Sequence, residues 1–306
     1  MNETVSGNRA AIWIDAMRPR TLPLAIASIL MGSALAASRP PFSWSVMILA
    51  VITAVLLQIL SNLANDYGDW QHGADSSQRE GPVRAVQSGT ISSRNMLAAV
   101  AIMSILSVIS GIALLWISFG IEGLPYFLLF IFLGAGAIVA ALGYTAGTRP
   151  YGYAGLGDIA VLIFFGWVAV VGTYFLQTHR LDWDVLLPAT SCGFLAVAVL
   201  NINNIRDRRS DALAGKNTVP VRYGLQAARI YHWSLLITAI LLAILYVALH
   251  YMSAWQFLFL LAVPLLLRNG LNVWRTGDPQ RLNPLLKQLS LSTLLFVLLF
   301  SLGQVL

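Results

Sequence analysis

The stretch Asn62–Gly89, NLANDYGDWQHGADSSQREGPVRAVQSG, closes a long apolar run with a sudden cluster of charges. Three aspartates, Asp66, Asp69 and Asp75, follow one another within ten residues. In a helix, Asn62, Asp66 and Asp69 stand at positions i, i+4 and i+7, so their side chains share one face. Carboxylates on one face repel each other unless a cation lies between them. The spacing therefore predicts an oxygen-lined cation site at the end of a helix.

An all-oxygen site of this kind suits a hard cation. Mg2+ keeps several of its waters and is held by one or two carboxylates together with substrate phosphates. Arg79 and Arg84 follow the aspartates at once, and guanidinium groups pair with phosphate oxygens. The alternative is a helix end that enters a solvated acidic loop and binds no ligand. A second copy of the pattern argues against that alternative.

The second copy lies in Asn201–Gly224, NINNIRDRRSDALAGKNTVPVRYG. Asn203, Asp207 and Asp211 recur every four residues, which again puts them on one helical face. Basic residues follow both copies at comparable places: Pro82-Val83-Arg84 in the first, and Lys216 with Pro220-Val221-Arg222 in the second. Two aspartate-rich helix ends, each with a basic loop, predict the two walls of a diphosphate–Mg2+ site.

The composition is that of a membrane protein. Hydrophobic residues make up 58% of the 306 residues, charged residues only 10%, and the mean hydropathy is +0.73, which excludes an ordinary soluble domain. We expect an all-α integral membrane protein with about nine transmembrane helices, because each span takes roughly 20 residues. The predicted apolar runs cover about 22–38, 45–65, 96–118, 125–145, 158–177, 185–203, 230–250, 254–268 and 286–305, of which the eighth is short.

The distribution of Lys and Arg sets the predicted orientation. With a cytoplasmic N-terminus, all but two of the 19 basic residues fall on the cytoplasmic side, as the positive-inside rule requires. The exceptions are Arg39 and Arg180. Both aspartate motifs then face the cytoplasm, and we expect the chain in a bacterial inner membrane. The net charge of +6 reflects this topology and gives no reason to expect a nucleic-acid partner.

The two motifs also predict an internal repeat. Four expected spans separate them, so both motif helices cross the membrane in the same direction, unlike the halves of an inverted repeat. We expect a single membrane-embedded domain over residues 1–306. It would consist of pseudo-repeated four-helix halves, at about 10–145 and 150–270, with an extra ninth helix at about 286–305. The polar loops would cap a shared central cavity.

A third polar group lies in the loop from Tyr144 to Asp158. Glycines and a proline mark this segment as a turn between two spans. Arg149 is its only basic residue and suits an acidic aromatic acceptor, whereas Asp158 opens the next span, where the helix dipole favours a carboxylate without any catalytic role. The tyrosines have a second interpretation as residues of the interfacial belt: Tyr144, Tyr151 and Tyr153.

Together these motifs resemble those of a known family. The patterns Asn65-Asp66-x-x-Asp69-x5-Asp75 and Asn203-Asn204-x-x-Asp207-x-x-x-Asp211 are similar to the motifs of the UbiA superfamily of membrane prenyltransferases. Within this superfamily, the chain most resembles enzymes that prenylate 1,4-dihydroxy-2-naphthoate in menaquinone biosynthesis. This closer resemblance rests on the segments Arg18–Pro23 (RPRTLP) and Gly81-Pro82-Val83-Arg84. The six-residue step from Asp69 to Asp75 is longer than the superfamily's commoner spacing, which places Asp75 past the helix.

The resemblance implies a reaction and a role for each residue. The donor is a polyprenyl diphosphate, the acceptor is 1,4-dihydroxy-2-naphthoate, and the transfer releases pyrophosphate and CO2 and gives demethylmenaquinone. Mg2+, with Mn2+ as an alternative, binds the diphosphate, and membrane lipid surrounds the protein. The implied metal ligands are Asp66, Asp69, Asp75, Asp207 and Asp211. These aspartates, except Asp75, are also the implied catalytic residues, together with Arg149 for the acceptor carboxylate and Asp158 for an acceptor hydroxyl. The implied substrate-binding residues are Asn62, Asn65, Arg79, Arg84, Tyr144, Tyr151, Tyr153, Asn203, Asn204, Lys216 and Arg222.

The sequence leaves other functions open. The next acceptor within the same class is 4-hydroxybenzoate, followed by homogentisate or a haem precursor. A secondary transporter or cation channel is the alternative from another class. Transporters place charged residues near the bilayer midplane, whereas these carboxylates lie at helix ends beside basic residues. Neither the prenyl length nor the oligomeric state follows from the sequence.

Overall fold

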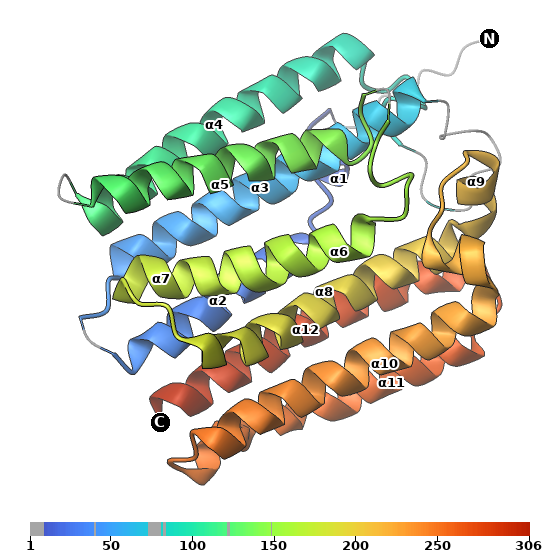
Figure 1. Cartoon of the computed structure of the whole chain (residues 1–306). Coiled ribbons are helices and arrows are strands. Elements are labelled where there is room, and N and C mark those ends of the chain that lie inside the picture. The colour runs from blue at the N-terminus through green and yellow to red at the C-terminus, as the bar shows by residue number, and fades with distance from the viewer. Residues whose placement is uncertain (1–8, 40, 73–80, 82–83, 121–122, 148) are drawn as a thin grey trace, which may run out of the picture.

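The protein is a bundle of long helices, as a computed structural model describes it (Figure 1). The structure describes residues 9–39, 41–72, 81, 84–120, 123–147 and 149–306, and over these residues it contains helices and no strands. The first half holds α1 (Arg9–Ala16), α2 (Leu22–Ala37), α3 (Trp44–Gln71), α4 (Ser93–Phe119) and α5 (Leu124–Gly143). The middle holds α6 (Gly157–Val161), the π-helical stretch η1 (Leu162–Val171), α7 (Gly172–Thr178), η2 (Trp183–Val185), α8 (Leu186–Arg206) and α9 (Arg208–Leu213). The last part holds α10 (Val219–Leu249), η3 (Ala254–Ala262), α11 (Val263–Arg275), η4 (Pro279–Arg281) and α12 (Leu282–Val305).

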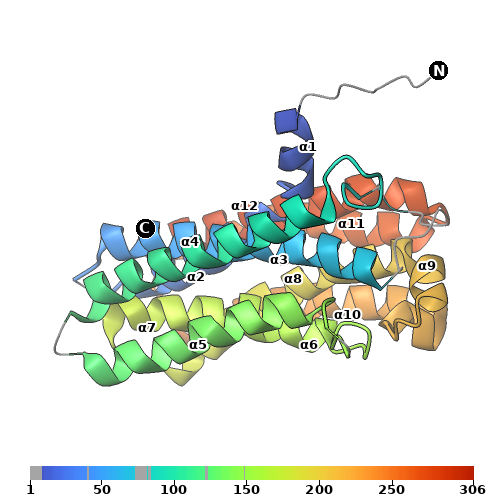
Figure 2. The ribbon, with the colours of Figure 1, turned by 90° about the horizontal axis from the view of Figure 1, so that it is seen from above.

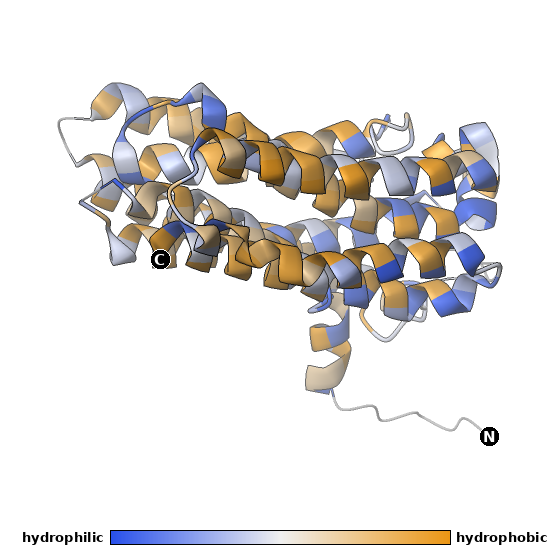
Figure 3. Ribbon diagram, turned by 90° about the horizontal axis from the view of Figure 1, so that it is seen from below, coloured by the Kyte–Doolittle hydropathy of each residue, from blue (hydrophilic) through white to orange (hydrophobic). Residues whose placement is uncertain are grey.

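The helices have the length and composition of membrane spans. Eight helical segments in the described part of the chain are long and apolar enough to cross a bilayer, and α2 is a shorter apolar helix of 16 residues. Figure 3 shows that the middles of the long helices are hydrophobic, while hydrophilic residues gather towards their ends. These segments confirm the predicted all-α membrane architecture with about nine helices. The shortest apolar helix is α2. The sequence predicts a short eighth span at about 254–268, but the corresponding helical segment Ala254–Arg275 is 22 residues long.

The short helix α2 lies inside the bundle. Most of its residues are buried, and it packs against α3, η1 and α12. Gly32 permits the close approach to η1 and α7, because a Cβ at this position would come within 2.9 Å of Thr173 Cβ and still closer to the carbonyl oxygen of Val170. A helix enclosed by other helices does not need to span the full hydrocarbon thickness of roughly 30 Å.

The helix ends that carry the two motifs meet at one end of the bundle. In Figure 1 the C-terminal end of α3, the short helix α9 and the start of α6 lie together, and the C-terminus of the chain lies at the opposite end. Figure 2, seen from above, shows α1 projecting sideways from the bundle near this region. The eight residues of α1 therefore do not run along the bundle axis with the long helices.

The hydrophobic core is larger in the second half of the chain than in the first. The helices α2, α7, α8, α10, η3, α11 and α12 share one large apolar core, which includes Phe259, Phe296 and Phe300. The helices α3, α4 and α5 contribute two smaller cores, and no residue of α5 is buried. The looser first half leaves room for a cavity between it and the tightly packed second half.

Candidate active site

An elongated cavity of about 670 Å³ connects the two motifs with the apolar interior. Its polar end lies between the C-terminal end of α3 and the junction of α8 with α9, and it includes Asp69 and Asp211. Its other end reaches Leu115 on α4, Phe130 on α5 and Leu176 on α7, towards the opposite end of the bundle. Most of the remaining wall is apolar. The cavity has the dimensions of a small-molecule site, with a charged head and a long hydrocarbon-like body.

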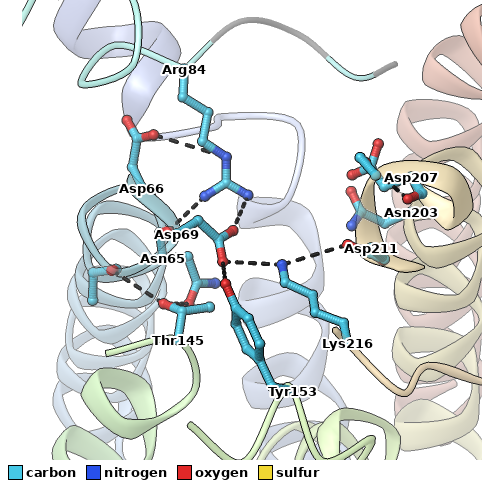
Figure 4. A network of polar contacts seen from close by, with 12 residues as sticks. Asn65, Asp66, Asp69, Arg84, Thr145, Tyr153, Asn203, Asp207, Asp211 and Lys216 are labelled. Carbon is cyan, nitrogen blue, oxygen red and sulfur yellow. Dashed lines mark hydrogen bonds and ion pairs between the residues drawn. The ribbon is translucent and has the colours of Figure 1, made fainter. Parts of the chain in front are cut away.

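The first aspartate motif occupies the last turns of α3. Asp66 and Asp69 are each 2% exposed. Arg84, from the segment before α4, lies with Nη2 2.6 Å from Asp69 Oδ2 and Nε 3.9 Å from Asp66 Oδ1, and its Nη1 donates a hydrogen bond of 2.6 Å to the backbone oxygen of Asn65 (Figure 4). Because buried carboxylates are costly unless a cation offsets their charge, Arg84 stabilises this helix end.

A lysine from the second half reaches across to the first motif. Lys216 Nζ lies 3.0 Å from Asp69 Oδ1 and 3.5 Å from Asp211 Oδ1, so it stands between the two walls (Figure 4). Tyr153 donates a hydrogen bond of 3.1 Å to the same oxygen of Asp69, and its ring lies 4.9 Å from the ammonium group. The space between the motifs therefore favours a positive charge. The sequence predicted a metal ion at this place, and here the charge is the ammonium group of Lys216.

The second motif spans a helix junction. Asp207 lies between α8 and α9 with φ −89° and ψ 9°. The Asp207 N–H donates to the Asn203 carbonyl oxygen at 3.0 Å, and the Asp211 N–H donates to the Asp207 carbonyl oxygen at 2.8 Å. These bonds continue the helical pattern through the junction, so the three side chains remain on the cavity side. Asn204, also predicted as a substrate-binding residue, lines the cavity beside them.

The asparagines of the first motif connect α3 to its neighbours. Asn62 Nδ2 donates to the Met17 carbonyl oxygen at 2.9 Å and to Thr21 Oγ1 at 3.0 Å, which ties α3 to the segment before α2. Asn65 Oδ1 accepts a hydrogen bond of 3.2 Å from Thr145 Oγ1, which lies just after α5. Both asparagines line the cavity. The network fixes the end of α3 relative to two other elements.

The three loop tyrosines all line the cavity, but their hydroxyl groups differ. Tyr151 donates to the Ala140 carbonyl oxygen at 2.8 Å, and burial raises its pKa to about 12. Tyr144 packs edge-on against Tyr151, with ring centroids 5.4 Å apart. Burial raises the pKa of Tyr144, and the nearby carboxylates of Asp69 and Asp211 raise it further. A protonated hydroxyl group at this position can donate a hydrogen bond to a ligand in the cavity.

Several predicted residues that the structure describes lie outside the cavity wall: Asp66, Arg149, Asp158 and Arg222. Arg149 is exposed. Asp158 is hydrogen-bonded to Tyr231 on α10, and Arg222 donates a hydrogen bond of 2.9 Å to the Ala154 carbonyl oxygen. The catalytic roles expected of Arg149 and Asp158 thus have no cavity contact to support them. Asp75 and Arg79 lie outside the described residues.

Two arginines at the site were absent from the predicted set. Arg18 lines the cavity from the segment between α1 and α2, with a φ of 52°, which is uncommon for a residue other than glycine. It belongs to the RPRTLP segment, so a signal for it was present in the sequence. Arg206 is 2% exposed and binds Asp207. Nothing in the sequence separated it from the other arginines of the second motif.

The donor groups at the polar end fit a hard cation. The buried residues Asp69, Asp207 and Asp211 offer only oxygen ligands, and four asparagine side chains also line the cavity: Asn62, Asn65, Asn203 and Asn204. Among the described residues, no three acidic, His or Cys side chains converge on a single metal position. Mg2+ suits such a site, because it takes one or two carboxylates and completes its octahedron with water and phosphate oxygens. Lys216 already places a positive charge between Asp69 and Asp211.

Known proteins are similar to this chain in sequence and in fold. The UbiA prenyltransferase family matches residues 25–299. Proteins of Haemophilus influenzae and Escherichia coli named 1,4-dihydroxy-2-naphthoate octaprenyltransferase are each 48% identical to it; the first match covers 95% of both chains, the second 97% of this chain and 96% of the relative. The apo structure of a UbiA homologue from Aeropyrum pernix superposes with a TM-score of 0.67 at 18% identity, covering 95% of this chain and 96% of that one. A UbiA homologue from Archaeoglobus fulgidus bound to GPP and Mg2+ gives 0.66 at 16% identity, covering 96% and 99%. This chain belongs to the UbiA prenyltransferase family.

Proposed function

We propose that this protein transfers a polyprenyl group from a polyprenyl diphosphate to 1,4-dihydroxy-2-naphthoate, in a reaction that depends on Mg2+. Relatives of that name, 48% identical over nearly the whole chain, support the choice of acceptor. Their name also makes the octaprenyl group the first donor to test. The dimethylallyl and geranyl donors named with Mg2+ in the solved structures support a diphosphate and a divalent ion at the same site.

The observation that carries the proposal is the shape of the cavity. Its charged end is flanked by the carboxylates of both motifs and by Arg84 and Lys216, and its body is apolar along α3, α4 and α5. A prenyl diphosphate has the same division, with two phosphates at one end and hydrocarbon along the rest. No residue of α5 is buried by other parts of the protein, so this wall of the cavity also faces the lipid in which such a donor dissolves.

The charged end is built to hold a departing diphosphate. Asp69 from the first motif, and Asp207 and Asp211 from the second, would hold Mg2+ ions by one or two carboxylates each, and these ions would supply positive charge to the phosphate oxygens. Arg84 and Lys216 would exchange their contacts with Asp69 for contacts with phosphate, because both lie within 3.0 Å of that carboxylate and line the cavity. Donors placed where negative charge develops lower the barrier to ionisation.

The reaction balances without an oxidant or reductant. The bond between the prenyl carbon and the diphosphate oxygen breaks, and the electron pair leaves with pyrophosphate. The ring carbon that bears the acceptor carboxylate attacks the allylic cation, and the carboxylate leaves as CO2 while its bonding electrons return to the ring. The immediate product is the hydroquinone form of demethylmenaquinone.

The acceptor side needs a cation for the carboxylate and a donor for a ring oxygen. Two arginines line the cavity in the described part of the chain, Arg18 and Arg84, and Arg84 pairs with Asp69 at the diphosphate end, which leaves Arg18 for the acceptor. Tyr144, whose hydroxyl group stays protonated, is the corresponding donor. Arg149 was the residue expected from the sequence, and it lies outside the cavity wall. We therefore assign the carboxylate to Arg18.

The membrane orientation belongs to the same proposal. We place the motif end of the bundle on the cytoplasmic side of a bacterial inner membrane, since Arg39 and Arg180 are the only basic residues assigned to the other side. Arg39 pairs with Asp182 beyond the far ends of α2 and α7, which is consistent with this assignment. Water-soluble acceptor and pyrophosphate would then enter and leave from the cytoplasm.

The test is an acceptor panel with purified protein. Octaprenyl diphosphate and Mg2+ are offered with 1,4-dihydroxy-2-naphthoate, 4-hydroxybenzoate or homogentisate, and product masses are recorded. We expect product only with the naphthoate, at a mass that shows loss of CO2, and none when a chelator removes the metal. Product from 4-hydroxybenzoate at an equal or higher rate would overturn the acceptor, and full turnover in excess EDTA would overturn the metal.

A further inference from the structure

Arg206 makes an unusual set of contacts inside the second motif. Its Nε lies 2.7 Å from Asp207 Oδ1 and its Nη2 lies 2.6 Å from Asp207 Oδ2, so the guanidinium holds both carboxylate oxygens. The same Nη2 donates to Asn203 Oδ1 at 2.6 Å, and Nη1 donates to Asn283 Oδ1 at 2.7 Å. With only 2% of the residue exposed, this is one of the largest fully buried side chains of the protein.

The two walls of the site are therefore neutralised differently. Asp69 is covered by Arg84 and Lys216, which come from segments outside α3 and keep 10% and 15% of their side chains exposed. Asp207 is covered by the residue that precedes it, buried in the same helix end. A cation at the rim can exchange its partner for phosphate, whereas Arg206 has no such access.

The last helix of the bundle completes the arrangement. Asn283 stands in the first turn of α12, 77 residues from Arg206, and its side-chain oxygen accepts a hydrogen bond from Arg206 Nη1. Gly81 lies against the same pair from the other side, since a Cβ there would come within 2.9 Å of Asp207 Oδ1 and 3.1 Å of Arg206 Nε. Arg206 thus holds the Asp207 carboxylate directly, Gly81 approaches it closely, and Asn283 acts on it only through Arg206.

We propose that Arg206 is a positioning residue, which acts through Asp207 and Asn203 to present their oxygen atoms to the metal–diphosphate site, and that Asn283 holds it in place. This inference rests on the proposed function for its ligand. Asp207 and Asn203 both line the cavity, and the guanidinium fork of Arg206 holds their side-chain oxygen atoms in fixed positions before any ligand arrives.

The consequence is a binding site that needs little rearrangement on one wall. Partners that orient metal ligands from behind typically change metal affinity by about 10- to 100-fold when they are removed. A lysine cannot replace the arginine, because one ammonium on a flexible stem cannot span both oxygens of Asp207 together with two amides. Loss of Arg206 should therefore weaken the binding of metal and diphosphate more than it changes the KM for the acceptor.

The experiment measures binding without turnover. Purified full-length protein is titrated with Mg2+ at fixed inorganic pyrophosphate, and the rise in melting temperature gives the Mg2+ concentration for half-maximal stabilisation. We expect Arg206→Lys to raise this concentration about tenfold. Asn283→Ala should raise it severalfold, and Asn283→Asp, which keeps an acceptor for Nη1, should stay closer to the wild type. The KM for the acceptor should not move in any of the three.

The control is Arg229→Lys. Arg229 on α10 donates a hydrogen bond of 2.7 Å to the Thr276 carbonyl oxygen and does not line the cavity. If Arg206→Lys does not fold, Asn283→Ala decides. The positioning role would be overturned if folded Arg206→Lys or Asn283→Ala protein needed the same Mg2+ concentration for half-maximal stabilisation as the wild type and the Arg229→Lys control. Wild-type protein that is stabilised by Mg2+ and pyrophosphate but prenylates no naphthoate would contradict the proposed acceptor instead, and would leave this result interpretable.

Discussion

Lys216 Nζ lies 3.0 Å from Asp69 Oδ1 and 3.5 Å from Asp211 Oδ1, so a single ammonium group joins the two aspartate motifs, which are more than 140 residues apart in the sequence. The contact shows that both motifs line one site. It also shows why a basic residue follows the second motif: without a cation between them, the two buried carboxylates would repel each other.

We predict that Lys216→Met lowers kcat/KM for the prenyl donor by on the order of a hundredfold, because it removes a positive charge next to the leaving group. The KM for the acceptor should change little. The measurement is the initial rate against each substrate in turn. Arg281→Met is the matched control, because Arg281 is a cation with a side chain that is 80% exposed, paired with Asp278. An equal loss in both variants would mean that Lys216 acts only through general charge.

The two aspartates of α3 should differ in importance. Asp69 lines the cavity and contacts both Arg84 and Lys216, whereas Asp66 does not line the cavity and lies 3.9 Å from Arg84 Nε. Asp69→Asn should lose on the order of a hundredfold or more in rate, and Asp66→Asn should lose less, since it acts through Arg84. Steady-state rates with saturating acceptor decide the order. A larger loss for Asp66→Asn would reverse this reading of the first motif.

The acceptor carboxylate should distinguish two arginines. Arg18→Ala is expected to raise the KM for the naphthoate by about tenfold or more, as expected for the loss of a charge-assisted hydrogen bond. Arg149→Ala is expected to leave it near the wild-type value, because Arg149 is exposed outside the cavity wall. The donor KM serves as the internal control in both variants. If only Arg149→Ala changes the acceptor KM, the sequence-based assignment was right and the cavity assignment was wrong.

The termini should lie on opposite sides of the membrane. An odd number of crossings follows if α2 spans together with the eight longer helical segments of the described chain. A tag at Met1 should be cytoplasmic and a tag after Leu306 should be outside, as the distribution of Lys and Arg requires. Labelling of intact cells with an impermeant reagent measures this. Both tags on one side would mean that a helix does not cross, and the 16-residue α2 would be the first candidate.

The sequence predicted the number of helices better than their ends. Hydropathy marks only the apolar part of a helix, so the second run was expected to stop near residue 65, whereas α3 continues to Gln71 and carries Asp66 and Asp69 in its last turns. The eighth span was judged short for the same reason, because α11 is amphipathic and ends in Trp274 and Arg275. The π-helical turn pattern of η1 has no sequence signal of this kind.

The two motifs of the site could be predicted from the sequence, but the contacts that surround them could not. Spacing within a helix fixes which side chains share a face, and Asn203, Asp207 and Asp211 all line the same cavity. Contacts between distant segments depend on packing. For that reason the sequence did not reveal that Asp158 would pair with Tyr231, or that Arg206 would bind Asn283 on the last helix.

The central claim is that the diphosphate binds between the two motifs, and one structure tests it directly. The protein would be solved with Mg2+ and an unreactive thiolo analogue of a prenyl diphosphate. We predict the two phosphates between Asp69 and Asp211, the prenyl chain along the apolar cavity, and Lys216 Nζ moved from Asp69 onto a phosphate oxygen. A diphosphate bound elsewhere, with the contact between Lys216 and Asp69 still at 3.0 Å, would contradict the account.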